Sequence, residues 1–471
     1  MKTIKQTTTK DVAVGKQRSY GEVVEFLDRN WSTNVSDKGF TVIKKLDQAF
    51  GNISQKLDTI LVGGTNGKSL TIHFATRLLK AEGLTVGAFF SPHILTYNEL
   101  FTLNNETISN KVFTEIGNEV INTAETLSIK ANSYELLAMM ALLYFKNNNA
   151  DVAVLEVREG GAQSPLSICN PKIAAITRIT DDETVDSNEQ VTKEIHELVG
   201  IVRPGTHVVC ADQSKLNLQE MAGIVEEKGG LWSMPIRKLA PLAYPFEQLH
   251  GRCAALAERV SQIYVNNVAN RDSIIVSGSL LTKQKGQRGR PTLEAKRQSE
   301  LNPRKTIEQF WKEEHSALPG RFQLLEKEKP TLLLDNANNL DAFKNLLLGI
   351  RLLHYHRPLK GLTLIIGCTN QDLNMPEFLK VLRYFFKKTS GQVIVCPIDV
   401  VPGHKGVKPA DIEKLTNDIK SMKIKARSAV NFKEAFEAAQ KTVDERHGLV
   451  VITGSASIVS EYWNYKGIKK F

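Results

Sequence analysis

A short apolar run that breaks into a glycine-rich turn constrains the fold of this chain more than any other segment. The run Ile60–Val62 leads into the turn Gly63–Ser69, and the spacing of apolar residues over Leu70–Glu82 is typical of a helix. A strand that enters such a turn directs successive backbone N–H groups at one point, and the start of the following helix adds the positive end of its dipole. The segment therefore predicts a strand–turn–helix unit that binds nucleotide phosphate.

The two residues that end the turn carry the chemistry of phosphate binding. Lys68 supplies a point charge for terminal phosphates, and the Ser69 hydroxyl suits a magnesium ion or a phosphate oxygen. Counted from Gly63, three residues precede the Gly-Lys pair, where the usual P-loop has four. The nucleotide-binding residues predicted in this turn are Gly64, Thr65, Asn66, Gly67, Lys68 and Ser69.

The length of the chain indicates how many domains to expect, and its charge indicates what kinds of partner it favours. A chain of 471 residues is too long for one ordinary core, so we expect two or three domains. The net charge of +10 favours anionic partners, such as nucleotides, polycarboxylates or nucleic acid. A basic surface that only keeps the protein soluble would give the same charge.

The cysteines and the N-terminus predict the compartment. None of the five cysteines forms a CxxC pair, which argues against a disulfide framework and a zinc site and fits a reducing environment. No apolar run approaches the roughly 18 residues that cross a bilayer, and Met1–Gln6 lacks an apolar signal core. We therefore expect a cytoplasmic protein with no membrane partner.

Strand-like and helical segments alternate through the first half of the chain. Strands are expected at Thr59–Val62, Thr85–Phe90, Asp151–Val157, Ile173–Ile179 and Thr206–Cys210, and an apolar helix at Tyr134–Phe145. Nearly all-apolar strands are typical of a parallel sheet that is buried on both faces. The pattern predicts a doubly wound α/β domain over residues 1–276, with ligands at the carboxyl ends of the strands.

The character of the chain changes after residue 276. Residues 277–317 are rich in Lys, Arg, Gly, Gln and Ser, which favours a solvated linker or excursion over a basic arm that binds nucleic acid. A second, smaller, Rossmann-like α/β domain is expected over residues 318–471. Its expected strands are Thr331–Leu334, Leu362–Ile366, Gln392–Cys396 and Leu449–Ile452, and its helices are Leu340–Leu353, Met375–Phe386 and Phe432–Arg446.

Five segments together carry a resemblance to a known family. They are Gly64–Lys68, Phe90–Ile94, Glu156–Gly161, Pro319–Phe322 and Leu334–Asn339. In this order they resemble the Gly-Thr-Asn-Gly-Lys, Thr-Ser-Pro-His-Leu, Glu-Val-Gly-Leu-Gly-Gly, Pro-Gly-Arg and Asp-Gly-Ala-His-Asn motifs of the folylpolyglutamate synthase and dihydrofolate synthase family. The similarity runs over nearly the whole chain and implies the architecture of the Mur-type ligases.

The resemblance implies how the site is built. Ser91 and Glu156 would hold the magnesium ions that bridge the ATP phosphates. The alternatives are a Ser-Pro turn residue and a capping or salt-bridged carboxylate. From the second domain, Arg321 would contact phosphate and Asp335 the ribose, unless they are a plain surface arginine and a local cap.

Several positions depart from the family motifs. The family has an Asp-His pair whose histidine contacts a second magnesium ion, and this chain has Asp181-Asp182-Glu183 there. Glu183 can still serve as a metal ligand, because a carboxylate binds a hard cation. Leu198 stands where the family has a lysine that is often carbamylated, and Asn338 stands where it has a histidine. Ser164–Ser167 replaces its Asp-Ala-Thr-Asn segment.

The resemblance implies an ATP-dependent ligase that joins L-glutamate to a folate or pteroate carboxylate through an acyl phosphate. The catalytic residues would be Lys68, Glu156 and Arg321, with ATP and Mg²⁺ as cofactors. We expect a monomer whose partners are small-molecule substrates and not nucleic acid. Two alternatives stay open: a nucleotide-binding relative that has lost ligation and acts as a regulatory or scaffold protein, and a Mur-type ligase for another acid.

Overall fold

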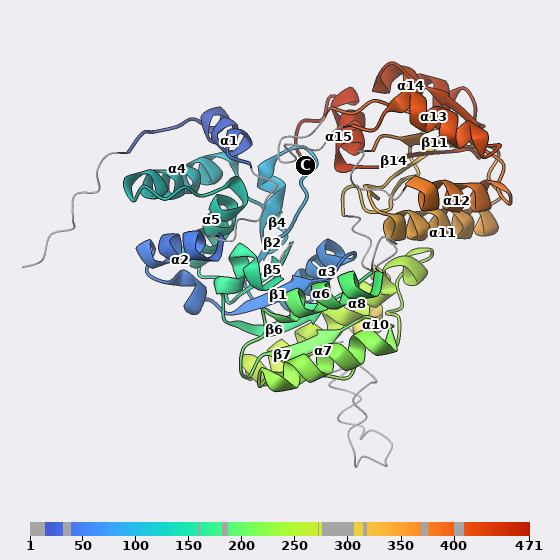
Figure 1. Ribbon diagram of the computed structural model, residues 1–471. Coiled ribbons are helices and arrows are strands. Elements are labelled where there is room, and N and C mark those ends of the chain that lie inside the picture. The colour runs from blue at the N-terminus through green and yellow to red at the C-terminus, as the bar shows by residue number, and fades with distance from the viewer. Residues whose placement is uncertain are drawn as a thin grey trace, which may run out of the picture.

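Two α/β units follow one another along the chain. The computed structural model describes residues 15–31, 39–158, 161–180, 187–271, 273–275, 306–313, 318–368, 375–399 and 409–471. Figure 1 shows the second unit, with α11 to α15, as a separate lobe beside the first. The doubly wound α/β class and the smaller C-terminal α/β unit predicted from the sequence are confirmed.

The first unit is built on an eight-stranded sheet in the order β4-β3-β2-β5-β1-β6-β7-β8. Its strands are β1 (Thr59–Gly63), β2 (Val86–Phe89), β3 (Phe101–Leu103), β4 (Glu106–Thr107), β5 (Val152–Glu156), β6 (Pro171–Ile176), β7 (His207–Cys210) and β8 (Leu231–Trp232). The pairs β2–β3 and β3–β4 are antiparallel, and the other pairs are parallel. The P-loop strand β1 therefore lies between two parallel neighbours, β5 and β6.

Helices cover both faces of this sheet. They are α1 (Tyr20–Arg29), α2 (Gly39–Ala49), α3 (Lys68–Ala81), α4 (Asn110–Thr126), α5 (Ser133–Asn147), α6 (Ser187–Val199), α7 (Lys215–Glu227), α8 (Phe246–Ile263) and α10 (Ile307–Glu313). Because side chains alternate along a strand, Leu61 faces the core under α2, α4 and α5, whereas Ile60 and Val62 face the core under α3 and α8.

The second unit has a six-stranded sheet in the order β13-β12-β11-β14-β10-β9, parallel except for β9. Its strands are β9 (Gln323–Leu325), β10 (Thr331–Leu334), β11 (Leu362–Ile366), β12 (Gln392–Val395), β13 (Lys425–Ser428) and β14 (Leu449–Thr453). Its helices are α11 (Leu340–His356), α12 (Met375–Phe386), α13 (Ile412–Ser421), α14 (Phe432–Gln440) and α15 (Ala456–Tyr465). Helix α14 is shorter than expected, because it ends at Gln440, about a turn and a half before the predicted end at Arg446.

Part of the predicted linker belongs to the core of the first unit. Helix α10 lies within residues 277–317, and its Trp311 is fully buried, with its ring 5.5 Å from that of Phe74 on α3. Ile307 and Phe310 join the same core. The prediction of a solvated segment is therefore wrong for residues 307–313, and residues 276–305 and 314–317 lie outside the described residues.

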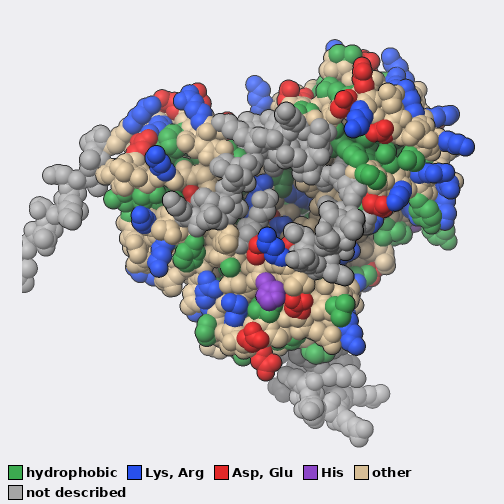
Figure 2. All heavy atoms as spheres, in the orientation of Figure 1, with side chains coloured by type: hydrophobic (Ala, Val, Ile, Leu, Met, Phe, Trp, Pro, Cys, Tyr) green, Lys and Arg blue, Asp and Glu red, His purple; other side chains and the backbone are tan. Residues whose placement is uncertain are grey.

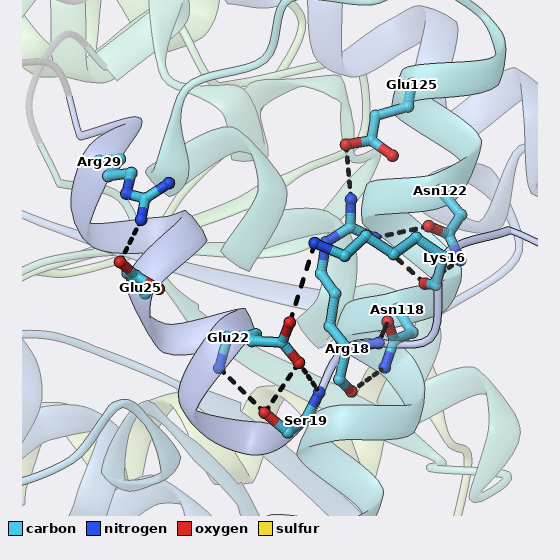
Figure 3. A network of polar contacts seen from close by, with 9 residues as sticks. All are labelled: Lys16, Arg18, Ser19, Glu22, Glu25, Arg29, Asn118, Asn122 and Glu125. Carbon is cyan, nitrogen blue, oxygen red and sulfur yellow. Dashed lines mark hydrogen bonds and ion pairs between the residues drawn. The ribbon is translucent and has the colours of Figure 1, made fainter.

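The chain before α1 is tied to α4 (Figure 3). The backbone N–H of Arg18 donates to Asn118 Oδ1 at 2.8 Å, and its guanidinium contacts Glu125 at 2.6 Å and Asn122 at 2.7 Å. Helix α1 then begins in a capping box, in which Ser19 and Glu22 each accept the other's backbone N–H. These contacts fix the segment before the N-terminal helix on α4.

Candidate functional site

Two glycines allow the P-loop turn to close tightly after β1. Gly64 and Gly67 have φ angles of 125° and 91°, in the left-handed region that favours glycine. A Cβ on Gly64 would lie 2.2 Å from Thr177 Oγ1, and one on Gly67 would lie 2.8 Å from Cys253 Sγ. The turn leads directly into α3, whose N-cap position, Gly67, makes no side-chain capping hydrogen bond. The N–H groups at the start of α3 thus face a place for an anion.

Lys68 lies over this turn, next to the carboxylate of Glu156. Its Nζ donates to the carbonyl oxygens of Gly64 at 2.8 Å and Thr65 at 3.2 Å. It also forms an ion pair with Glu156 Oε1 at 3.6 Å, and both side chains are largely buried. The predicted phosphate-binding lysine and the predicted metal-binding glutamate therefore belong to one site.

Glu156 ends β5 and contacts Ser91, which follows β2. Glu156 Oε2 accepts hydrogen bonds from the Ser91 backbone N–H at 2.5 Å and from its Oγ at 3.2 Å. A carboxylate beside a hydroxyl fits Mg²⁺, which binds oxygen ligands and takes the rest of its shell from substrate phosphates and water. Among the described residues no group of three His, Cys, Asp or Glu side chains could hold a metal by itself, and the predicted third ligand, Glu183, lies outside them.

Arg321 and Asp335 reach the same place from the second unit. Arg321 Nε donates to the Ser69 hydroxyl at 3.2 Å, across 252 residues of sequence. Burial lowers the pKa of Arg321, and the carboxylates of Asp335, Glu156 and Glu99 oppose this effect. Arg321 is thus not a plain surface arginine, because it contacts the P-loop and its charge interacts with the site carboxylates of Asp335 and Glu156.

Asp335 caps the local chain, which is the alternative considered from the sequence, and its contact with the ribose stays a prediction. Its carboxylate accepts the backbone N–H of Phe322 at 2.7 Å and of Ala337 at 2.9 Å, so it caps the local chain. Burial raises its pKa to about 6, against the lowering effect of these hydrogen bonds and of Arg321. The side chain also lines the cavity described next.

A cavity of about 1130 Å³ lies between the two units. In Figure 2 the surface is hollowed between them, and Lys and Arg side chains are visible in the hollow. The predicted site residues that line it are Gly64, Thr65, Asn66, Gly67, Lys68, Ser69, Ser91, Glu156, Arg321 and Asp335. The structure therefore brings every predicted site residue except the undescribed Glu183 to one cavity.

At the position of the family lysine, this chain has an apolar side chain that packs against the P-loop turn. Leu198 is buried and lies against Gly63, where a Cβ would come within 2.1 Å of its Cδ1. Two acidic side chains of the same helix, Glu194 and Glu197, line the cavity beside it. The sequence alone showed no substitute for the negative charge of a carbamylated lysine. Glu194 lies four residues before Leu198 on the same helix, and residues at this spacing are neighbours on a helix surface, so this spacing could have pointed to Glu194.

Arg158, which lines the cavity after β5, lies beside two aromatic rings. The Arg158 guanidinium lies 5.8 Å from the ring of Trp31 and 6.0 Å from that of Tyr134. The Tyr134 hydroxyl donates to the Glu156 carbonyl oxygen at 3.2 Å. Sequence analysis missed this group, because Trp31 and Tyr134 precede Arg158 by more than twenty residues and carry no motif.

Helix α8 forms the opposite wall with the second unit. His250 lines the cavity, and its ring lies 5.5 Å from that of Phe246 and 6.4 Å from that of Phe322. Burial, with His73 nearby, lowers the pKa of His250 to about 4. A neutral, aromatic surface of this kind suits a flat uncharged ring.

Comparisons with known proteins agree with this geometry. A family model described as dihydrofolate synthetase, C-terminal domain, matches residues 320–465. The chain is 25% identical over 319 residues to the dihydrofolate synthase/folylpolyglutamate synthase of Bacillus subtilis. The aligned region covers 65% of this chain and 71% of that protein.

Two solved structures share the fold over almost their whole length. Folylpolyglutamate synthase of Mycobacterium tuberculosis complexed with ADP has a TM-score of 0.73 at 19% identity and covers 95% of this chain and 98% of that chain. A bifunctional folylpolyglutamate synthase/dihydrofolate synthase of Yersinia pestis complexed with AMPPNP and Mn has a TM-score of 0.71 at 19% identity and covers 96% of this chain and 100% of that chain.

Proposed function

We propose that the chain is a member of the folylpolyglutamate synthase and dihydrofolate synthase family and that it is an ATP-dependent ligase that joins L-glutamate to a folate or pteroate carboxylate. One observation carries the proposal above all others. Arg321, from the second unit, lies on Ser69 of the P-loop, in a cavity that also holds Lys68, Ser91 and Glu156. A site that positions phosphate from both sides is what transfer of a phosphoryl group requires.

The chemistry follows from the poor leaving ability of a carboxylate oxygen. The acid's carboxylate attacks the γ-phosphorus of ATP, and the bond from phosphorus to the β,γ-bridging oxygen breaks, which gives an acyl phosphate and ADP. The glutamate amine then attacks the acyl carbon, loses a proton and displaces inorganic phosphate to form the amide. The protein's part in both steps is positioning and electrostatic stabilisation.

The residues of this chain divide that task. Lys68 and the N–H groups at the start of α3 would hold the β- and γ-phosphates in line with the acid. Arg321 would stabilise the charge that builds on the transferring group. Ser91 and Glu156 would hold Mg²⁺, which supplies charge neutralisation on the phosphate oxygens when bound. The site residues and their roles are part of this proposal.

The remaining features follow the same proposal. Among the described residues, no helix combines the length and the apolar character needed to span a bilayer. We propose a cytoplasmic monomer, in keeping with free cysteines that are buried or half-buried and form no disulfide. The folate and polyglutamate substrates are anions, which suits the net charge of +10.

The test is the release of ADP from ATP and Mg²⁺ by the full chain. It is run with dihydropteroate or tetrahydrofolate, each with and without L-glutamate. The proposal expects ADP release that requires both the acid and glutamate. ATP binding without such release would favour a relative that has lost ligation, for which the replacement of the family lysine by Leu198 is the specific observation. Release with another acid would favour a ligase of different specificity.

A further inference from the structure

The P-loop is held by the second unit through the side chain of Asn66. Its Nδ2 donates to Asn339 Oδ1 at 3.0 Å and to Asp341 Oδ2 at 2.9 Å. Its Oδ1 accepts from Asn339 Nδ2 at 3.0 Å, so the two amides form a reciprocal pair. Both partners of Asn66 are more than 270 residues away in sequence.

The partners of Asn66 lie on a rigid element. Asn339 is the N-cap of α11, and its Oδ1 also accepts the backbone N–H of Ala342 at 2.9 Å. Asp341 lies in the first turn of α11, is buried, and receives a hydrogen bond from Asn345 at its own carbonyl oxygen. The Asn66 side chain therefore meets a surface whose geometry is fixed by the start of a 17-residue helix.

Arg178 connects the same helix to the other side of the P-loop. Its carbonyl oxygen accepts the backbone N–H of Thr65 at 2.7 Å. Its guanidinium forms an ion pair with Asp341 Oδ1 at 2.9 Å. The two carboxylate oxygens of Asp341 thus contact the P-loop residue Asn66 and the residue that braces the P-loop from β6. We call Asn66, Arg178, Asn339 and Asp341 the latch.

We propose that the latch residues on α11 are positioning residues, which give the P-loop its phosphate-binding shape only when the second unit is closed on the first. The proposal rests on the proposed function. The directions of the loop N–H groups depend on the backbone at Thr65 and Asn66, and the latch fixes both residues. Parting of the units would remove every described side-chain hydrogen bond of Asn66.

This arrangement couples nucleotide binding to closure. A ligand that binds the closed form better shifts the population towards it, and by linkage anything that stabilises the closed form raises the affinity for that ligand. The effect of Asp341 on nucleotide must then pass through the P-loop residues that it fixes, Asn66 directly and Thr65 by way of Arg178. If Asp341 instead contacted the nucleotide directly, the loss of affinity caused by its removal would add to the loss of affinity caused by removing the Asn66 side chain.

A double-mutant cycle on the full chain tests the latch. The affinity for ADP is measured by calorimetry for the parent, Asn66→Ala, Asp341→Ala and the double variant. Asp341→Asn keeps one oxygen that can accept the Asn66 N–H but loses the charge that pairs with Arg178, and Lys344→Ala changes an exposed residue of α11 as the matched control. Thermal unfolding of every variant accompanies the titrations.

The proposal expects each single alanine variant to bind ADP at least about fivefold more weakly, the range of an ordinary allosteric coupling. The double variant should bind no more weakly than the weaker single variant. Lys344→Ala should stay within about twofold of the parent, and Asp341→Asn, which loses the ion pair with Arg178, should lie between the parent and Asp341→Ala. Parental affinity in Asp341→Ala, or losses that multiply in the double variant, would overturn the latch. A parent that binds no ADP would instead overturn the proposed function, and the latch with it.

Discussion

At the scale of single residues, the phosphate-binding lysine is held by contacts that an anion would replace. The Lys68 ammonium lies on the carbonyl oxygens of Gly64 and Thr65 and beside Glu156. These partners keep the charge at the mouth of the turn and bury little apolar surface. The residue therefore matters for binding more than for folding.

We expect Lys68→Ala to reduce the affinity for ATP by at least about tenfold, because a charge-assisted contact to phosphate contributes a few kcal/mol in a largely buried site. Its thermal unfolding midpoint should stay close to that of the parent. The matched control is Lys80→Ala, in the last turn of the same helix, where the side chain is exposed. ATP affinity within a factor of two of the parent would remove the phosphate-loop interpretation.

Glu156→Gln should separate metal binding from nucleotide binding. The amide still accepts a hydrogen bond from Ser91 and loses the negative charge that a hard cation needs. We expect the Mg²⁺ concentration for half-maximal activity to rise by more than about tenfold, while ADP affinity measured without metal changes little. An unchanged Mg²⁺ titration would make Glu156 a structural partner of Lys68 and Ser91 and place the metal elsewhere.

At the scale of elements, the start of α5 contains a carboxyl group that favours its neutral form. Burial raises the pKa of Glu135 from 4.5 to about 7, against the lowering effect of its hydrogen bond from the Asn132 N–H. The pKa of Glu135 is higher in the folded than in the unfolded state. The contribution of this carboxyl to the free energy of unfolding is therefore complete below the unfolded-state pKa and is lost as the pH rises through about 7.

Glu135→Gln keeps the capping hydrogen bond and cannot ionise. We expect its unfolding midpoint, relative to the parent, to rise steadily between pH 5 and pH 8, as measured by thermal denaturation across about six buffers. The control is Glu22→Gln in the exposed capping box of α1. Hydrogen bonds from Ser19 lower the pKa of Glu22 below 4.5, so this carboxyl is ionised in both the folded and the unfolded state above pH 5, and the difference between this variant and the parent should stay constant through that range. A pH-independent difference for Glu135→Gln would show that the carboxyl is ionised at no cost.

Helix α10 shows that a polar segment can still contribute to the core. Trp311 is fully buried against Phe74 and Phe310. We expect Trp311→Ala to lower the free energy of unfolding by about 3–5 kcal/mol, the usual cost of a cavity of that size. Lys312→Ala, at the exposed neighbour, should change it by less than about 0.5 kcal/mol. Chemical denaturation measures both, and equal stability of the two variants would mean that α10 does not pack as described.

At the scale of the whole molecule, the sequence predicted most of the fold and the outline of the site. The carboxyl ends of parallel strands meet at one edge, so Ser91 after β2 and Glu156 after β5 could be expected beside the P-loop after β1. Family motifs placed Arg321 and Asp335 with them. The domain boundaries proposed from the sequence stay a prediction.

Contacts between the two units could not be predicted in this way. Arg178 and Asp341 carry no motif, and their ion pair depends on how one unit is placed against the other. The same holds for Ile94, which follows Ser91 in the first unit and packs into a core of the second. Helix α10 was missed because seven residues among many charged ones give too short a periodic pattern.

The central claim is that one ATP site is assembled from both units, and Arg321→Ala tests it most directly. The contact of Arg321 with the transferring phosphoryl group would strengthen towards the transition state, so its loss affects turnover more than binding. Two quantities are measured for Arg321→Ala and the parent: steady-state ADP release in the presence of the acid and glutamate, and ATP binding by calorimetry. Arg351→Ala, on α11 outside the cavity lining, is the control. The account predicts turnover lower by more than about tenfold in Arg321→Ala alone, with a smaller change in ATP affinity. Full turnover by Arg321→Ala would contradict it and confine the site to the first unit.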